Sequence, residues 1–166
     1  THNLREGLHA LYPLVKYRND EKAQDLAEAC AKEMWNADSA SQRLGMTLAH
    51  IAPGHATLEM ELSEQMTNGH GNAHGGYLFT LADSAFAFAC NTYNEMTVAQ
   101  HCSVTYITPG ALGDQLTATA REISRKGRSG IYDVTITRED GTVIAEFRGH
   151  SRTLSRPLLP GTRAEG

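Results

Sequence analysis

The stretch from Asn72 to Cys90, NAHGGYLFTLADSAFAFAC, constrains the fold most strongly, because it predicts a helix that is apolar almost all round. Such a helix must be covered on most of its surface. Strand-like runs follow it at about residues 97–108, 115–125, 129–138 and 142–153, and the segment EDG between the last two is typical of a tight turn. This order predicts an α+β fold in which an antiparallel sheet curls around the helix.

The residues before the long helix predict further elements of the same domain. A clean alternation of apolar and polar residues over 55–62 indicates a half-buried strand, and 44–50 indicates a shorter one. An acidic first turn and helical apolar spacing predict a helix from Asp20 that lies over the main body. We therefore expect an N-terminal extension and helix over residues 1–37, a main domain over 38–153 and a loose C-terminal tail over 154–166. Residues 1–19 contain the helix breaker Pro13 and are expected to be an appendage.

The composition limits the class of protein. The chain has 166 residues, of which 40% are hydrophobic, as expected for one soluble globular domain. Its formal net charge of −4 argues against a nucleic-acid partner, which usually requires a basic surplus. Three cysteines without paired spacing predict reduced thiols in a cytoplasmic protein. No signal peptide is recognisable and no run approaches the length of a membrane span, so we expect no membrane partner.

The long helix has two different faces at 100° per residue. One face is broad and apolar and should pack on the sheet; it comprises Leu78, Leu81, Ala82, Ala85, Phe86 and Ala89. The other face is expected to meet a ligand or a second chain, because its residues are small apart from one acid; it comprises Gly76, Thr80, Asp83, Ala87 and Cys90.

Asp83 and the start of this helix form the candidate reactive group. The nearest Lys or Arg residues in sequence are Arg43 and Arg121, so no local cation neutralises the Asp83 carboxylate. The first amides of a helix that begins at Gly75-Gly76 have no intrahelical acceptor, and glycine lets a carbonyl oxygen approach them. An amide that polarises a carbonyl, combined with a carboxylate that attacks or activates water, is a minimal acyl-transfer site. Gly-Gly as a simple tight turn and Asp83 as a structural acid are the alternatives.

The segment NGHGNAHGGYLFTLADSAFAFACN closely resembles the phenylacetic-acid-degradation (PaaI-type) acyl-CoA thioesterases of the hotdog-fold superfamily. The similarity continues through VTYITPGALGDQLTATA, GIYDVTI and AEFRGHSR, and covers roughly residues 38–153. Residues 1–37 depart from the shorter family pattern. The resemblance implies a hotdog fold, homodimers with sheets joined edge to edge, and usually a dimer of dimers. It also implies hydrolysis of aryl-acetyl-CoA, either phenylacetyl-CoA or a ring-hydroxylated form, without a metal or organic cofactor.

The resemblance also assigns roles by position. It implies that Asp83 is the general base or the nucleophile, and that the Gly75 amide polarises the thioester carbonyl, with Gly76 beside it. Asn68 would position water or the carboxylate, and His74 would shape the helix entrance. Family analogy further favours the basic cluster of residues 125–128 (Arg125, Lys126, Gly127 and Arg128) as a clamp for the CoA phosphates, although a solvated hairpin edge explains it equally well.

The spacing within the helix predicts how such a site is assembled. Gly75 and Asp83 are eight residues apart, which at a rise of 1.5 Å per residue separates them by about 12 Å along one helix. One thioester carbon cannot meet both groups at that distance. Two helices packed antiparallel across a two-fold axis would bring Asp83 of one chain to Gly75 of the other.

Four alternatives stand against this function. A zinc site could use His70 and His74 with His55, His101 or Asp83, but i, i+4 spacing has no helical meaning in a Gly-rich loop. A hotdog hydratase or dehydratase would need a His–Asp or His–Glu pair that this motif does not reproduce well. A noncatalytic acyl-CoA binding protein is the third possibility. Ser84 lacks the elbow motif of a serine hydrolase.

Overall fold

The computed structural model describes the backbone of residues 4–163 and the side chains of residues 19–163. The chain begins with α1 (Leu4–Ala37) and a short α2 (Ser39–Arg43), followed by β1 (Thr47–Ala52), β2 (His55–Glu61) and a 3-10 turn η1 (Glu64–Met66). The long apolar segment forms α3 (Gly75–Cys90). The remaining strands are β3 (Thr97–Tyr106), β4 (Gln115–Lys126), β5 (Ser129–Thr137) and β6 (Val143–Thr153).

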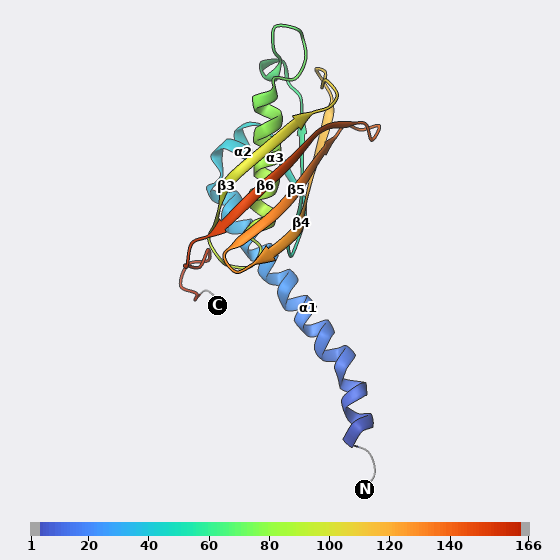
Figure 1. Cartoon of the computed structure of the whole chain (residues 1–166), viewed down its shortest axis with the longest axis vertical. Coiled ribbons are helices and arrows are strands. Elements are labelled where there is room, and N and C mark those ends of the chain that lie inside the picture. The colour runs from blue at the N-terminus through green and yellow to red at the C-terminus, as the bar shows by residue number, and fades with distance from the viewer. Residues whose placement is uncertain (1–3, 164–166) are drawn as a thin grey trace.

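The six strands form one antiparallel sheet in the order β1-β2-β4-β5-β6-β3, and the sheet curves around α3 (Figure 1). This confirms the α+β fold with a long central helix that the resemblance implies. β3 follows α3 in the chain but pairs with β6 at the far edge, and not with β4, its neighbour in sequence. As a result, β3 and β1 are the two edge strands of the sheet.

The core lies between the apolar face of α3 and the concave face of the sheet. All six residues of the predicted apolar stripe of α3 are buried. They meet alternating buried residues of the central strands, such as Leu58 on β2, Ala118 on β4 and Val134 on β5. Cys90, on the opposite face of α3, is also buried, with 4% of the residue exposed. Hydrogen bonds of 2.9 Å join Asn91 to both the N–H and the carbonyl of Thr97, so this turn closes over the end of the helix.

The N-terminal helix is longer than the sequence predicts. The expected start was Asp20, whereas α1 begins at Leu4 and its backbone remains helical through Pro13. A proline removes one backbone donor, but the hydrogen bonds on either side of it can continue. The C-terminal part of α1 packs on the body through Ala27, Cys30 and Ala31. The N-terminal part of the helix extends beyond the sheet (Figure 1). No helix within residues 4–163 is long and apolar enough to cross a membrane.

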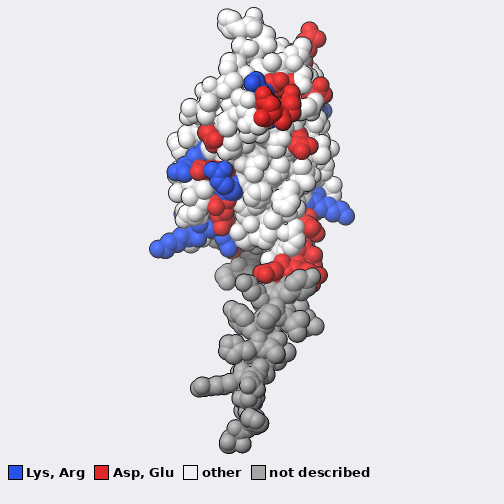
Figure 2. Space-filling model, turned by 90° about the vertical axis from the view of Figure 1, so that its right-hand side faces the viewer, with Lys and Arg blue, Asp and Glu red and all other residues white. Residues whose placement is uncertain are grey.

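The outer face of the sheet is polar. A bidentate ion pair joins Arg148 on β6 to Asp133 on β5, with nitrogen–oxygen distances of 2.6 and 2.8 Å. On the side of the molecule shown in Figure 2, acidic and basic side chains lie interspersed around a largely uncharged centre.

Candidate active site

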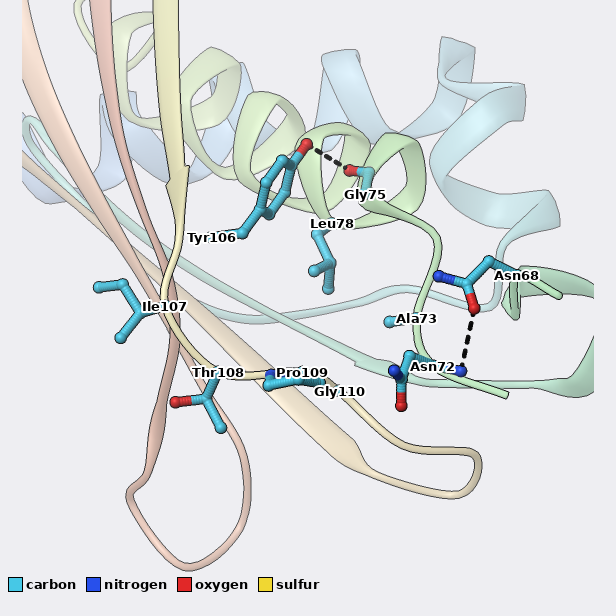
Figure 3. A pocket seen from close by; sticks show the side chains of 10 residues that line it. All are labelled: Asn68, Asn72, Ala73, Gly75, Leu78, Tyr106, Ile107, Thr108, Pro109 and Gly110. Atoms are coloured by element: carbon cyan, nitrogen blue, oxygen red, sulfur yellow. Dashed lines mark hydrogen bonds between the residues drawn. The ribbon is translucent and has the colours of Figure 1, made fainter. Parts of the chain in front are cut away.

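The N-terminus of α3 is shaped by His74 and opens into a cavity. His74 is the N-cap residue, and its Nδ1 accepts a hydrogen bond of 3.0 Å from the Gly76 N–H. This occupies the Gly76 amide, so Gly76 offers no free donor. The Gly75 N–H, by contrast, has no acceptor among the described residues. Gly75 lines a cavity of about 410 Å³ (Figure 3). The helix end therefore presents one free amide, at Gly75, to this cavity.

Asn68 contributes a second donor to the same cavity. Its Oδ1 accepts hydrogen bonds from the His70 and Asn72 amides at 2.9 and 3.2 Å. These bonds fix the orientation of the side chain, so that Nδ2 is the free end of the amide. The Nδ2 group lines the cavity with Gly75 (Figure 3), and no described residue accepts a hydrogen bond from it.

Tyr106 closes the Gly75 cavity on the side of the sheet, and no sequence motif points to it. Its hydroxyl donates a hydrogen bond of 2.9 Å to the Gly75 carbonyl across 31 residues of sequence. A Cβ added at Gly75 would lie 2.8 Å from the Tyr106 ring, so only glycine fits at this position without movement.

Asp83 lies in a different hollow. This second cavity has a volume of about 290 Å³ and is lined by residues of α1, α3, the start of β3 and the C-terminal segment. Neither a hydrogen bond nor an ion pair reaches the carboxylate from any residue whose side chain is described. Burial raises the pKa of Asp83 above its usual 3.8. An unpaired, partly buried carboxylate is costly and is characteristic of functional sites.

The neighbours of Asp83 are unsuited to nucleophilic catalysis. Burial raises the pKa of the Cys90 thiol to about 12 and also raises that of Cys102, with a smaller contribution from the Asp83 charge in both cases. Neither thiol is therefore activated as a thiolate. Ser84 bonds to Ser41 at 2.9 Å, and Ser41 donates its own proton to Asp38 at 2.6 Å. Ser84 thus fastens α2 to α3, with no histidine in the chain of bonds.

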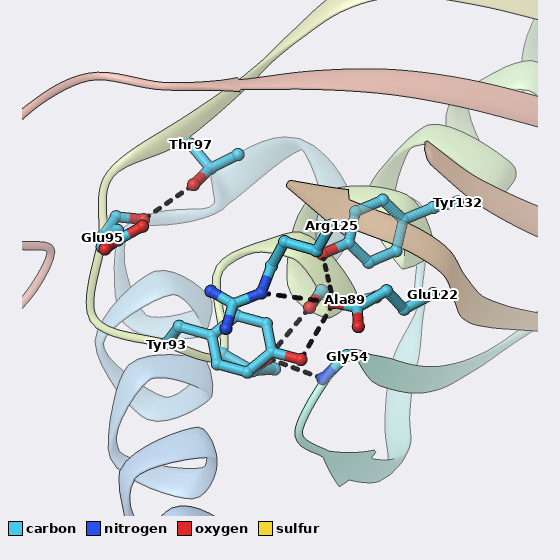
Figure 4. Close-up of polar contacts among 9 residues, drawn as sticks. Gly54, Ala89, Tyr93, Glu95, Thr97, Glu122, Arg125 and Tyr132 are labelled. Carbon is cyan, nitrogen blue, oxygen red and sulfur yellow. Dashed lines mark hydrogen bonds and ion pairs between the residues drawn. The ribbon is translucent and has the colours of Figure 1, made fainter. Parts of the chain in front are cut away.

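Two of the three cations in the basic cluster, Arg125 and Arg128, already make contacts within the chain. The Arg125 guanidinium lies 3.5 Å over the Tyr93 ring and 3.7 Å from Glu122, which also accepts hydrogen bonds from Tyr93 and Tyr132 (Figure 4). Arg128 donates to the Thr153 carbonyl at 3.1 and 3.3 Å. Gly127 supplies the left-handed turn between β4 and β5, with φ of +60°.

Lys126 differs from the two arginines of this cluster. It is exposed, and no side chain in the described part of the chain pairs with it. The β4–β5 hairpin lies beside the start of β3, because Ser129 pairs with Arg152 and Thr97 with Thr153. Within one chain, the hairpin therefore lies near the Asp83 hollow and far from the Gly75 cavity.

The histidines within residues 19–163 do not assemble into a metal site. Among the residues that the structure describes, no three His, Cys, Asp or Glu side chains gather to hold a metal ion. His101 instead packs edge to face on His150, and His55 on His50. The His74 ring is engaged by the Gly76 amide, and no described carboxylate forms the His–acid pair that a hydratase needs.

Comparison with known proteins gives a consistent result. The model of the thioesterase superfamily matches residues 70–145. The acyl-coenzyme A thioesterase PaaI of Escherichia coli K12 is 39% identical over 75% of this chain and 89% of that protein. The solved structure of E. coli PaaI, from the phenylacetic acid degradation operon, superposes with a TM-score of 0.78 and 37% identity over 79% of this chain and 95% of that one. A hypothetical thioesterase of Streptococcus pneumoniae TIGR4, solved with coenzyme A, is similar with a TM-score of 0.64 and 25% identity over 71% and 90%.

Proposed function

The chain belongs to the thioesterase superfamily, and from this premise we propose that it hydrolyses aryl-acetyl-CoA, as phenylacetyl-CoA or a ring-hydroxylated form, to the free acid and CoA. The E. coli relative is named an acyl-coenzyme A thioesterase and comes from a phenylacetic acid degradation operon, which supports this acyl class. The observation that carries the proposal is the pair of complementary half-sites, a free Gly75 amide in one cavity and an unpaired Asp83 carboxylate in another.

The chemistry of the two half-sites is matched to a thioester. The Gly75 N–H binds the carbonyl oxygen and stabilises the negative charge that develops on it, with the Asn68 amide as a second donor or as a ligand for water. Asp83 either accepts a proton from an attacking water or attacks the carbonyl carbon itself. If water attacks, its oxygen forms the new C–O bond and Asp83 takes up the proton; if Asp83 attacks, the acyl–Asp83 anhydride that forms is then hydrolysed by water. On either route the C–S bond breaks, and the thiolate of CoA leaves and takes up a proton. His74 keeps the helix end in place but does not transfer the proton.

The two half-sites lie at opposite ends of one edge strand. The Asp83 hollow includes Val98 and Ala99 at the start of β3, whereas the Gly75 cavity includes Tyr106 at its end. The outer edge of β3 pairs with no other described strand, and Val98 and Tyr106 are 41% and 51% exposed. Antiparallel pairing of two β3 strands would set the start of one beside the end of the other. We therefore propose a homodimer with two shared sites, which a dimer of dimers would retain.

The same pairing gives the basic hairpin a role. Lys126 lies on the Asp83 side within its own chain, so in the dimer it approaches the Gly75 cavity of the partner. We propose that Lys126 contributes most to binding the CoA phosphates, since Arg125 and Arg128 are engaged within the chain.

The three free cysteines support a cytoplasmic location, where thiols remain reduced.

A direct assay tests the function. The purified protein is mixed with a panel of aryl- and alkyl-acyl-CoA esters, and the released CoA is trapped by a chromogenic thiol reagent. We expect turnover with the highest kcat/KM for aryl-acetyl esters. Tight binding of the esters without any CoA release would identify a noncatalytic binding protein, and conversion of an added 2-enoyl-CoA to the 3-hydroxyacyl-CoA without CoA release would indicate a hydratase.

A further inference from the structure

The hollow around Asp83 is closed by two segments outside the central helix and sheet. Met34 of α1 and Leu158 of the C-terminal segment both line it, together with Phe86 of α3 and Met96 before β3. In Figure 1 the C-terminal segment lies at the end of α3, next to the point where α1 meets the body. Residues from four separate parts of the sequence thus line one space of about 290 Å³.

Apart from Asp83, the lining of this hollow offers no free polar side chain among the described residues. Its two polar side chains other than Asp83 are Asn91 and Thr97. The Asn91 side chain bonds to the Thr97 backbone and the Ala87 carbonyl, and the Thr97 hydroxyl donates to the Glu95 carbonyl. The Asp83 carboxylate is consequently the one polar side chain of the lining that lacks a partner among the described residues. An apolar space with a single unpaired carboxylate suits an apolar group whose reactive end lies at that carboxylate.

The C-terminal segment, which the sequence predicts to be loose, is held firmly in place. It contains no helix or strand over residues 154–163, but the buried Asn94 binds it at two points. Asn94 Oδ1 accepts a hydrogen bond of 2.8 Å from the Leu159 N–H, and Nδ2 donates one of 3.0 Å to the Thr162 hydroxyl. The Asn94 backbone has a φ of +57°, a conformation that asparagine tolerates better than most residues. These bonds hold Leu158 against the hollow.

We propose that this hollow is the acyl-group pocket and that Leu158, held by Asn94, limits the size of the acyl group. The inference rests on the proposed role of Asp83, since the acyl group must extend from the carbonyl carbon that Asp83 attacks. An apolar cavity of about 150 Å³ accommodates a benzene ring in another protein. About twice that volume here accommodates one ring with its methylene linker. Leu158 and Met34 close the pocket to larger groups.

Substitution of Leu158 tests the pocket directly. Leu158→Ala should raise kcat/KM for 2-naphthylacetyl-CoA relative to phenylacetyl-CoA by about 10-fold, because removing a side chain from an apolar pocket changes discrimination by that order. Leu158→Trp should lower the turnover of phenylacetyl-CoA, because the larger side chain fills the pocket, and should leave the turnover of acetyl-CoA unchanged. Leu159→Ala is the matched control, since Leu159 is the adjacent residue, does not line the hollow and holds Asn94 only through its backbone.

Asn94→Gly tests the tether separately from the pocket wall. Glycine tolerates the left-handed backbone, so the variant removes the two side-chain bonds without adding strain. It should shift the naphthyl-to-phenyl ratio in the same direction as Leu158→Ala. An unchanged ratio in folded Leu158→Ala and Asn94→Gly proteins would overturn the proposal.

A binding experiment separates this inference from the proposed function. Affinities for S-(2-phenylethyl)-CoA and S-(2-naphthylethyl)-CoA, which cannot be hydrolysed, are measured by calorimetry with the same variants. If the wild-type protein hydrolyses no ester, the proposed function fails, while the ratio of these affinities still decides the pocket. A ratio that moves with Leu158 supports the acyl pocket, and a ratio that does not move refutes it.

Discussion

Tyr106 covers Gly75 so closely that the helix end and the last residue of β3 form one unit: its hydroxyl bonds to the Gly75 carbonyl at 2.9 Å, and its ring leaves no room for a Cβ. This contact makes Gly75→Ala informative. We expect it to reduce kcat/KM by about 10- to 100-fold, because either the helix end shifts or the Tyr106 ring moves and gives up its bond to the Gly75 carbonyl, while the amide hydrogen is kept. Adding Tyr106→Leu should restore much of the loss by making room for the methyl group. A double variant as inactive as Gly75→Ala would show that the contact does not explain the defect.

Asp83→Asn should lower kcat by about 100-fold or more, because the amide can neither accept the proton nor attack. The same change should raise the melting temperature at pH 7, since it removes the cost of a partly buried, unpaired charge. Steady-state kinetics and thermal unfolding of both proteins measure the two effects. Near-normal turnover in the folded variant would reject Asp83 as the reactive carboxylate.

The raised pKa of Asp83 predicts the pH dependence of both activity and stability. Activity requires the carboxylate, so kcat should fall as the pH drops through a pKa above the usual 3.8. The folded state holds this proton more tightly than the unfolded state does. The contribution of Asp83 to stability is therefore most favourable below pH 3.8 and is lost as the pH rises through the folded pKa. In Asp83→Asn both dependences should disappear, which a pH series of kcat and of unfolding free energy would reveal.

Mixed dimers test whether each site is shared between two chains. One chain carries Asp83→Asn, and the other carries Gly75→Pro with Tyr106→Leu, which removes the Gly75 amide hydrogen and makes room for the proline. Random pairing makes about half of the dimers mixed, and each mixed dimer has one intact site, so about a quarter of wild-type activity should return. Each variant alone serves as the inactive control. If mass spectrometry shows mixed dimers but activity stays absent, both halves of a site come from the same chain.

The two neighbouring cations of the β4–β5 hairpin should behave differently. Lys126→Ala should raise KM for CoA esters several-fold with little change in kcat, because it removes a free charge from phosphate binding. Truncated pantetheine esters, which lack all of those phosphates, should be unaffected. Arg125→Ala should instead lower the melting temperature, since Arg125 covers Tyr93 and faces Glu122. Equal losses on CoA and pantetheine esters in Lys126→Ala would contradict the phosphate role.

The sequence by itself determined the six strands, the long helix α3 and the inner face of that helix. The periodicity of Leu78, Leu81 and Ala85 identifies the buried stripe of α3, and alternation identifies the half-buried β2, because both patterns are local consequences of backbone geometry. The motif around His74 and Asp83 likewise led to the thioesterase family, since a short Gly-rich loop before a helix is a local feature.

Tertiary structure alone decided which groups are free to react. The sequence cannot show that His74 occupies the Gly76 amide and leaves Gly75 free, nor that Tyr106 covers Gly75 from 31 residues away. The pairing of β3 with β6 depends on which edge of the sheet remains open, and that pairing leaves β3 as an edge strand that reaches both half-sites. The position of Leu158 depends on hydrogen bonds from Asn94, 65 residues away from Leu159. Contacts of this range arise only when the chain closes on itself, because no local pattern encodes them.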